Sequence, residues 1–416
     1  MIYIKKSKLY PPYILLIIIY IFFIITALIL DSPIEILRGL KHIVLSPDIL
    51  ISDYVEIGGI GAALFNSALT SMFSLFLLVF IGVKPNGSTI MSLWLITGFS
   101  FFGKNILNIW PIIFGVYLYS KYQKEPFLNY SLVAMLSTTL APTVSQLSFT
   151  NYFPTPLGVI LGYIIGIITG FILAPISSHC IKAHNGYNLY NIGFSAGIYA
   201  TLIMAIFRAL GIEFESRFLW NTESNFVFTI LLLIISIYLI FIGIYKNPSF
   251  KKDFLLLLKQ PGRLVSDFYL LFGKTCYFNM GILCIFSTIL VLILKSNLNG
   301  PTIAAIFTIV GFGAFGKHIK NILPIIVGAI LAALININPI NSPSLILSIL
   351  FSTALCPISG KFGYKFGILA GFLHVNMVTN IGYLHGGLNL YNNGLAAGFV
   401  TMILIPIINI FEKETL

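Results

Sequence analysis

Long apolar segments with almost no charge constrain the fold of this chain more than any other feature. Residues 13–30 and 225–245 approach the roughly 20 residues that a helix needs to cross a bilayer, and about fourteen such segments follow one another along the sequence. Charged residues make up only 9% of the 416 residues, whereas soluble domains carry roughly 25%. Because backbone polar groups in lipid must be satisfied within the segment, these segments are predicted to be helices. The sequence thus predicts an all-α integral membrane protein with about 12–14 transmembrane helices.

The lysine-rich amino terminus precedes the first apolar run and indicates a retained first span. Lys5, Lys6 and Lys8 come before residues 13–30, which lack the small-residue cleavage site of a secretory signal. The net charge of +11 is attributed to short loops that orient the helices, and not to nucleic-acid binding. The four cysteines have no metal-ligand spacing, so we expect buried free thiols.

An internal repeat of polar and small residues runs through the sequence. Lys104 and Lys317 each end a Phe-Gly-Lys triplet, and other residues match at the same offset. These further matches are Gly98 with Gly311, Asn66 with Asn279, Pro111 with Pro324 and Gly115 with Gly328. Polar matches in one register are uncommon by chance, so the chain is predicted to contain two copies of one helical unit.

The best-matching stretch lies at the end of each copy. Residues 162–198 align without a gap to 363–399, and the motif His-x-Gly-x-Asn-Leu-Tyr-Asn-x-Gly occurs at 184–193 and 385–394. The predicted organisation is a lead-in with the first span at 1–53, repeat unit one at 54–210, a connector with one span and a basic loop at 211–266, repeat unit two at 267–408, and a tail at 409–416.

The distribution of charge among the loops predicts that the two units have opposite orientations. Cytoplasmic loops are rich in Lys and Arg, which places the lysine-rich amino terminus and the basic loop at 246–263 inside the cell. Residues 31–56 and 210–223 carry most of the acidic residues and are placed outside. The crossings of unit one and the connector make an odd number, whether the segments at 87–120 and 300–336 cross or re-enter. We therefore expect inverted-topology repeats in the cell membrane, with both termini cytoplasmic.

Inverted repeats are a recurring transporter architecture, with the substrate site at midplane between the repeats. Channels share this symmetry, so function must be argued from the duplicated polar residues. Lys104 and Lys317 each lie between two short apolar segments. A cation there could neutralise an anionic substrate; alternatively, each lysine could extend from a loop to the membrane interface.

The duplicated motif at 184–193 and 385–394 contains the second group of candidates. Asparagine offers both a donor and an acceptor and could replace the hydration shell of a solute; the alternative is helix capping by Asn, with Tyr in the interfacial belt. Histidine could titrate near neutral pH and couple transport to protons, or form an interfacial hydrogen bond. The candidates are Asn188, Asn191, Asn389 and Asn392 for substrate binding, and His184 and His385 for proton coupling.

Two further kinds of duplicated polar residue lie within apolar spans. Hydroxyl residues precede Pro142 and Pro357, where a proline could break the helix and expose ligand-facing ends, or only kink it. A lone asparagine in the first span of each unit could contact solute or hydrogen-bond between helices. These candidates for substrate binding are Ser137, Thr138, Ser352, Thr353, Asn66 and Asn279.

Acidic residues cluster in loops and at the termini, and none is expected deep inside a span. Proton or sodium couplers commonly use a buried carboxylate. This pattern disfavours a carboxylate-based pump. It leaves a passive channel, a facilitator, or a carrier whose ion site consists of Asn, Ser and carbonyl oxygens.

The Phe-Gly-Lys and Gly-x-Asn-Leu-Tyr-Asn-x-Gly motifs resemble those of a family of bacterial multi-pass membrane proteins, known as a domain of unknown function present in two copies. The likeness covers both units and implies a membrane protein without naming a substrate. The Tyr-Asn-x-Gly patterns at Tyr190-Asn191 and Tyr391-Asn392 are also faintly similar to those of urea channels, which have two inverted helical units.

These observations favour a membrane transporter or facilitator for a small polar or anionic solute, bound between two inverted repeats. The alternatives are a passive channel for a small neutral solute or ion, and an intramembrane enzyme acting on a lipid. The enzyme would need acidic metal-binding clusters or paired catalytic residues within spans, so we expect no enzyme, no catalytic residue, no metal and no cofactor. The expected partners are the lipid bilayer and a solute or ion substrate, with a homo-oligomer left open and nucleic acid excluded.

Overall fold

The computed structural model describes residues 9–150, 152–263 and 266–413, and within these ranges the named elements are all helices. Ten helical stretches, three of them made of consecutive named elements, are long and apolar enough to cross a membrane. Three shorter apolar helices cover 87–99, 300–312 and 319–334. All four cysteines are free and buried, as predicted. The protein is therefore an all-α integral membrane protein.

The described residues contain fewer candidate spans than the sequence predicted, because several apolar segments form short helices. The predicted spans at 87–102 and 105–120 correspond to α5 and α6, each of 13 residues. At a rise of about 1.5 Å per residue, each is about 20 Å long, against a hydrocarbon core of about 30 Å. Their apolar composition reflects burial within the protein: nearly every residue of α5 is buried by its neighbours.

The helices form two series in the same order. The first series is α1 (Pro11–Leu30), α2 (Pro33–Leu45), α3 (Tyr54–Gly58), α4 (Ile60–Phe80), α5 (Gly87–Phe99), α6 (Trp110–Tyr122), η1 (Phe127–Tyr130), α7 (Ser131–Ser137), η2 (Thr138–Leu140), α8 (Ala141–Phe149), α9 (Thr155–Ala183) and α10 (Asn191–Ala209). The second is α11 (Asn225–Ile244), α12 (Phe250–Leu257), α13 (Phe268–Phe272), α14 (Thr275–Ile293), α15 (Gly300–Phe312), α16 (Ile319–Leu334), α17 (Pro343–Phe351), η3 (Ser352–Leu355), α18 (Cys356–Phe362), α19 (Tyr364–Ile381), η4 (Gly382–His385) and α20 (Asn392–Lys413).

Helices at the same place in the two series pack against equivalent neighbours. Helix α1 packs on α4 as α11 packs on α14, and α6 packs on α9 as α16 packs on α19. Between the series, α5 packs on α15 and α10 packs on α20. Helices α1 and α11, which lie outside the predicted repeat units, therefore also take equivalent places.

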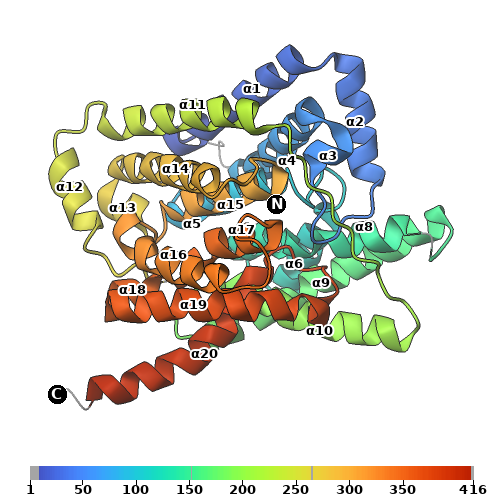
Figure 1. Ribbon diagram of the computed structural model, residues 1–416. Coiled ribbons are helices and arrows are strands. Elements are labelled where there is room, and N and C mark those ends of the chain that lie inside the picture. Colours follow the sequence, from blue (N-terminus) through green and yellow to red (C-terminus); the bar gives the residue numbers. More distant parts are fainter. Residues whose placement is uncertain (1–8, 151, 264–265, 414–416) are drawn as a thin grey trace.

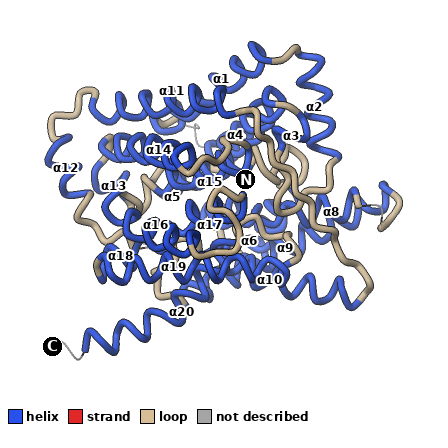
Figure 2. Tube along the Cα trace, viewed as in Figure 1, coloured by secondary structure: helices blue, strands red, loops and turns tan. Residues whose placement is uncertain are grey.

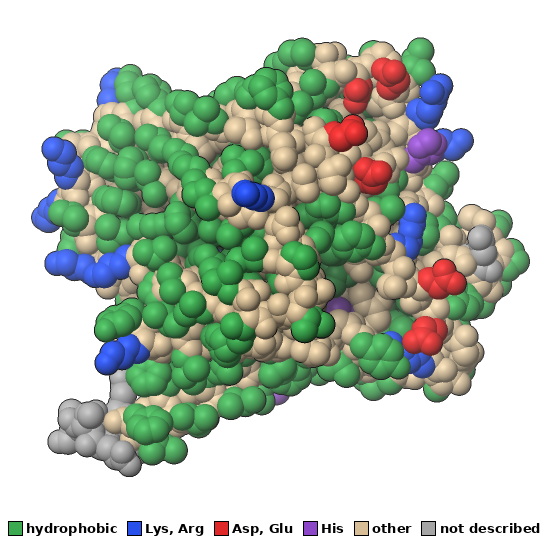
Figure 3. All heavy atoms as spheres, viewed as in Figure 1, with side chains coloured by type: hydrophobic (Ala, Val, Ile, Leu, Met, Phe, Trp, Pro, Cys, Tyr) green, Lys and Arg blue, Asp and Glu red, His purple; other side chains and the backbone are tan. Residues whose placement is uncertain are grey.

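Figure 1 shows most of the long helices lying side by side along the horizontal direction of the view. Helix α1 leads into α2 at the right-hand end, whereas α11 leads into α12 at the left-hand end. Connecting loops lie at both ends of these helices (Figure 2). On the visible face in Figure 3, the acidic side chains gather toward the right-hand end, and the left-hand edge carries Lys and Arg. The surface between the two ends is largely hydrophobic.

The short helices α5 and α15 pack together in the core of the molecule. Trp94 and Phe307, which occupy equivalent positions, contact each other with ring centroids 5.0 Å apart. A Cβ atom added at Gly98 would lie only 3.0 Å from Cα of Ala304. Glycine at this position thus lets the two helix backbones approach closely.

An aspartate from each series, Asp53 buried and Asp267 partly exposed, ties the core together by capping the short helix of the other series. Asp53 accepts a hydrogen bond from the backbone N–H of Gly300, the first residue of α15, at 3.1 Å. Asp267 accepts the equivalent bond from Gly87, the first residue of α5, at 2.8 Å. Carboxylates are stabilised at helix amino termini, so the two aspartates hold the short helices in place from opposite units.

One long helix of each series is interrupted where the sequence predicted a possible proline break. A 3₁₀ turn covers Thr138–Leu140 in the first series and Ser352–Leu355 in the second. Pro142 and Pro357 follow at the start of the next helix. Because proline has no N–H to continue the α-helical ladder, the backbone tightens into a 3₁₀ turn before it.

Candidate functional site

The loop after each short helix turns a lysine away from the helix axis. Gly103 and Gly316 have positive φ angles of 82° and 111°, a conformation that glycine adopts without strain. The next residues, Lys104 and Lys317, donate their backbone N–H to the carbonyl oxygen of the last residue of the helix, at 3.0 and 2.8 Å. This is the Schellman pattern that ends a helix at glycine, and it explains the duplicated Phe-Gly-Lys triplet.

The asparagine in the first long helix of each unit holds this loop in place. Asn66 Nδ2 donates to two carbonyl oxygens of its loop, at 2.7 and 3.0 Å, and the second belongs to Lys104. Asn279 Nδ2 donates to the two equivalent oxygens at 2.8 and 2.7 Å, the second belonging to Lys317. Both amides therefore bind backbone in this structure, so these two predicted substrate-binding residues support the lysine loops.

Each lysine side chain meets a tyrosine of the other unit. Lys104 Nζ donates to the hydroxyl oxygen of Tyr391 at 2.7 Å and lies 4.7 Å from the centre of its ring. Lys317 Nζ donates to the hydroxyl oxygen of Tyr190 at 2.5 Å and lies 4.5 Å from the centre of that ring. Both lysines are fully buried. The two pairs are reciprocal, since the lysine of each unit binds the equivalent tyrosine of the other.

The tyrosines are positioned by the asparagines two residues before them. Asn188 Nδ2 donates to the carbonyl oxygen of Gly394, and Asn389 Nδ2 to that of Gly193, both at 3.0 Å. The side-chain oxygen of each asparagine accepts the backbone N–H of its tyrosine, at 2.9 and 3.1 Å. A Cβ added at Gly394 would lie 2.7 Å from Cα of Gly193, so these glycines let α10 and α20 begin against each other.

The remaining motif residues form local pairs. Nε2 of His184 lies 2.9 Å from Oδ1 of Asn191, and Nε2 of His385 lies 2.8 Å from Oδ1 of Asn392. Asn191 also donates to the backbone of α9. Burial lowers the pKa of His184, which favours its neutral form. In this structure each histidine therefore binds the asparagine of its own motif, and Asn191 also binds α9; the predicted substrate-binding and proton-coupling roles stay predictions.

The hydroxyl residues at the broken helices differ between the two units. Thr353 Oγ1 accepts a hydrogen bond from Lys317 Nζ at 2.8 Å and donates to a backbone carbonyl oxygen. Its counterpart Thr138 donates to backbone, as does Ser352. The buried hydroxyl of Ser137 has no hydrogen-bond partner among the described residues. Thr353 is therefore the only one of the four predicted hydroxyl residues that reaches a central lysine.

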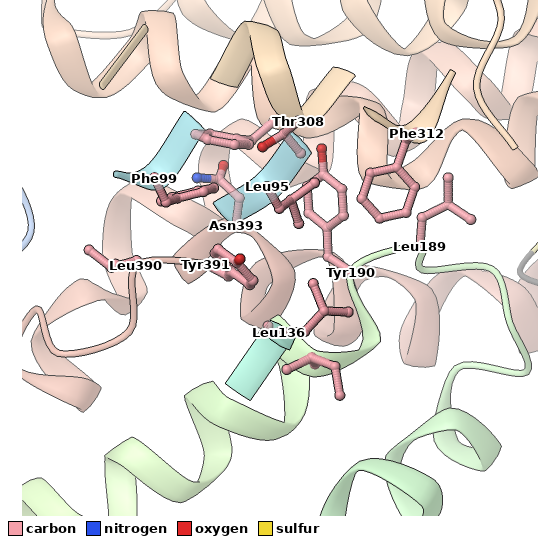
Figure 4. A pocket seen from close by; sticks show the side chains of 13 residues that line it. Leu95, Phe99, Leu136, Leu189, Tyr190, Thr308, Phe312, Leu390, Tyr391 and Asn393 are labelled. Atoms are coloured by element: carbon pink, nitrogen blue, oxygen red, sulfur yellow. The ribbon is translucent and has the colours of Figure 1, made fainter. Parts of the chain in front are cut away.

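A small cavity of about 20 Å³ lies between Tyr190 and Tyr391, the partners of the two lysines, with room for about one water molecule. Figure 4 shows the aromatic rings of Phe99, Tyr391, Tyr190 and Phe312 across this cavity. Phe99 and Tyr391 have ring centroids 4.6 Å apart, and Tyr190 and Phe312 have centroids 5.1 Å apart. Phe351 contacts both Phe99 and Tyr190. The cavity walls are therefore largely aromatic and aliphatic, and the structure is closed at its centre.

Burial lowers the pKa of both central lysines, to about 7 for Lys317. Within the described residues the one salt bridge joins Arg208 and Glu213, so no acidic side chain balances a lysine that is charged. Burying a charged ammonium group without a partner costs several kcal/mol. The tyrosine hydroxyls and aromatic faces offset part of this cost, because a ring face attracts a cation. A bound anion would complete the compensation.

Sequence reasoning missed four functional candidates. The alternative interpretation of the duplicated motif placed Tyr190 and Tyr391 in the membrane interface, but the structure buries them at the centre. The sequence feature that could have identified them is the duplication of the motif. Asp48 and Asp53 lie in a loop, as predicted, but both are fully buried. Only Asp53 carried a signal in the sequence, because it matches Asp267 in the second unit.

Comparison with known proteins places the chain in a family without naming a substrate. The family described as "Protein of unknown function (DUF1576)" matches residues 32–209 and 246–410. These two segments run from α2 to α10 and from α12 to α20, and they agree with the predicted family in two copies. No curated protein and no solved structure matches the chain, so the faint similarity to urea channels gains no support. The chain belongs to the DUF1576 family, which it matches over both of its repeats.

Proposed function

We propose that this protein is a membrane transporter or facilitator that moves a small anion through the interface of its two repeats. The observation that carries this proposal is the reciprocal pair of buried lysines, Lys104 and Lys317, each facing a tyrosine of the other unit without an acidic partner in the described residues. An anion entering the centre would find an ammonium group and a phenol hydroxyl on each side. Such convergent donors stabilise an anion strongly in a site that excludes water.

An inverted arrangement of the repeats would allow transport by alternating access, and the reciprocal contacts support it. Contacts in which residue i of one unit meets residue j of the other, and j meets i, are those of a two-fold relation. Helices α1 and α11 lead into α2 and α12 at opposite ends of the molecule (Figure 1). With the axis in the membrane plane, the unit-one lysine loop and the unit-two lysine loop approach one central site from opposite sides. The basic end around α12 is then cytoplasmic.

The closed aromatic centre favours a carrier over an open channel. The cavity of about 20 Å³ cannot hold a solute larger than water, so the tyrosines must separate before an anion binds. Because Tyr190 and Tyr391 stand at the start of α10 and α20, small movements of these helices would open one lysine–tyrosine pair at a time. The mainly apolar walls would favour a small monovalent anion, which loses less hydration energy than a multivalent one.

Flux measurements in proteoliposomes test this function. Purified protein is reconstituted, and uptake of a panel of small inorganic and carboxylate anions is compared with that of neutral solutes. We expect anion flux in the wild type and at least a tenfold loss in Lys104→Met and Lys317→Met, equivalent to about 1.4 kcal/mol or more. Lys84→Met, which removes an exposed lysine near the start of α5, is the matched control and should transport normally.

Two results would count against the proposal. The first is wild-type protein that carries neutral solutes but no anion. The second is full anion flux in the double variant Lys104→Met with Lys317→Met, because the central charge would then have no role.

A further inference from the structure

The two units differ at the layer just outside the lysine loops. Ser46-Pro47-Asp48, just before the first unit, corresponds to Gln260-Pro261-Gly262, just before the second, at the offset that also relates Asp53 to Asp267. Around this segment, further residues are exchanged between the units. The first unit has Asn105, Ser145 and Gln146 where the second has His318, Gly360 and Lys361. A buried carboxylate therefore stands beside one lysine loop only.

Asp48 is fully buried, and its two carboxylate oxygens have different surroundings. Oδ2 accepts hydrogen bonds from Ser145 Oγ at 2.9 Å, Asn108 Nδ2 at 3.1 Å and Asn105 Nδ2 at 3.3 Å. Oδ1 has no hydrogen-bond partner among the described residues. Buried acceptors are rarely left unpaired. The buried Tyr54 hydroxyl interacts with Asp48 and favours its ionised form.

A second unpaired acceptor belongs to the same cluster. Gln146 Nε2 donates to the backbone carbonyl oxygen of Asp48 at 2.9 Å, while Gln146 Oε1 is buried and has no partner among the described residues. Two buried oxygens in one cluster thus have no hydrogen-bond donor among the described residues. A proton on Asp48 would supply a donor and would also remove the buried negative charge.

Several charged and titratable groups surround this cluster. The Arg217 guanidinium donates to Ser46 Oγ and to the carbonyl oxygen of Pro47, and its charge favours the ionised form of Asp48. Burial has the larger effect and raises the pKa of Asp48 to about 7. Tyr54 of α3 opposes the effect of burial more strongly than Arg217 does. The other such groups on the surrounding elements are Glu56 of α3, Lys104 in the adjoining loop, Glu213 and Glu215 in the neighbouring cavity, and His385, two residues before the Gly387 carbonyl that accepts from Leu50 N–H.

An open cavity leads from the surface to this cluster. It has a volume of about 440 Å³, and Gln146, Pro47, Glu213, Glu215 and Arg217 are among its lining residues. Two glutamates and one arginine line it, and Glu213 also pairs with Arg208. The lining thus carries one more acidic than basic side chain, and a wall of this sign favours cations.

The second unit has a matching cavity of about 430 Å³ of the opposite character. It is lined by His318, Lys259, Lys320 and Lys361, among others. In the predicted orientation, the acidic cavity opens outside and the basic cavity opens to the cytoplasm.

Asn108 connects Asp48 to the central site. Its Nδ2 donates to Asp48 Oδ2 and also to the carbonyl oxygen of Gly103, at 3.1 Å in each case. Gly103 is the residue with positive φ in the turn that directs Lys104 toward Tyr391. Protonation of Asp48 weakens its hold on the Asn108 amide, so the state of the carboxyl group acts on the lysine loop through two hydrogen bonds.

We propose that Asp48 is the binding site of a coupling proton, which enters through the acidic cavity and is carried with the anion. This inference rests on the transport function proposed above. A hydrated proton transfers H⁺ to Asp48 Oδ1 and leaves water, and release on the other side reverses this step. One proton moves with one monovalent anion, so the complete cycle moves no net charge.

Two transport modes separate this inference from the proposed function. Exchange of labelled anion across the membrane at equal pH requires only the central site, whereas uphill accumulation driven by an inward proton gradient requires coupling. We expect Asp48→Asn to keep exchange within about twofold of wild type and to lose at least 90% of proton-driven accumulation. Glu223→Gln, an exposed carboxylate outside the lining of the acidic cavity, should leave both modes unchanged.

The possible outcomes are distinct. Absence of exchange in the wild type would overturn the transport function itself. Exchange together with normal proton-driven accumulation in Asp48→Asn would overturn only the proton site. Accumulation driven by a sodium gradient at constant pH, and lost in Asp48→Asn, would assign the site to Na⁺ and overturn the proton.

Ser145→Ala provides a second test if Asp48→Asn does not fold. Removing a donor to Oδ2 destabilises the carboxylate, so the pH midpoint of accumulation should rise by about one unit. An infrared carboxyl band that titrates with the same midpoint, and is shifted in Ser145→Ala, would identify Asp48 as the group. An unchanged midpoint in both measurements would contradict the proposal.

Discussion

The two repeats agree at the centre of the molecule and differ toward its two ends. Where they touch, the contacts are reciprocal: the lysine of each unit binds the tyrosine of the other, and each asparagine before the tyrosine binds the opposite backbone. Toward the ends, Asp48 and Gly262 occupy equivalent positions in the repeat. The cavity near Asp48 is acidic and the cavity at the equivalent place near Gly262 is basic. Contacts at a two-fold interface must serve both units, whereas in the proposed orientation the outer layers would face different compartments. The symmetric part thus suits binding, and the asymmetric part suits coupling and direction.

The aspartates that cap the short helices offer the largest test of this comparison. Asp53 accepts three backbone N–H groups, from Val55, Asn221 and Gly300, and is fully buried. Asp267 accepts two and is partly exposed. Asp53→Ala should cost on the order of 3 kcal/mol, because three buried donors lose their acceptor, and Asp267→Ala on the order of 1 kcal/mol. Thermal unfolding in detergent measures both, and equal losses would show that the two caps are equivalent.

Some features of the two repeats could be predicted from the sequence, and others could not. Matches in one register predicted the duplication, the lysines and the asparagine motif. The sequence could not pair Lys104 with Tyr391, because the contact joins residues far apart in the chain and depends on how α20 packs. It also predicted spans at the short helices, since apolarity does not distinguish burial in protein from burial in lipid. Asp48 appeared as an ordinary loop acid because only tertiary packing removes it from water.

The two tyrosines should contribute unequally to transport. Tyr391 is the one hydrogen-bond partner of Lys104 Nζ among the described residues, whereas Lys317 Nζ also binds Thr353. Tyr391→Phe should therefore lower anion flux about tenfold, a loss of about 1.4 kcal/mol, and Tyr190→Phe about threefold. Phenylalanine keeps the ring and removes only the hydroxyl. Equal losses in the two variants would show that the Thr353 hydroxyl does not compensate for the loss of the Tyr190 hydroxyl at Lys317.

The buried carboxylate of unit one predicts a pH dependence of stability. Burial raises the pKa of Asp48 to about 7 in the folded protein, against about 3.9 for an unperturbed aspartate. The folded state then binds the proton more tightly than the unfolded state, so this group's contribution is greatest below pH 4 and is lost as pH rises to 7. Asp48→Asn should flatten this slope and unfold about 3 °C higher than wild type at pH 8. A slope that persists in the variant would locate the titration elsewhere.

The smallest effect should come from the threonines of the broken helices. Thr353 Oγ1 accepts from Lys317 at 2.8 Å, whereas Thr138 Oγ1, at the equivalent position, has backbone as its partner. Valine has nearly the shape of threonine without the hydroxyl. Thr353→Val should lower anion flux about threefold, because Lys317 keeps its bond to Tyr190, and Thr138→Val should leave flux unchanged. If Thr138→Val lowered flux as much, the opened state would bring this hydroxyl to Lys104, and the asymmetry of the lysines would belong to the closed state alone.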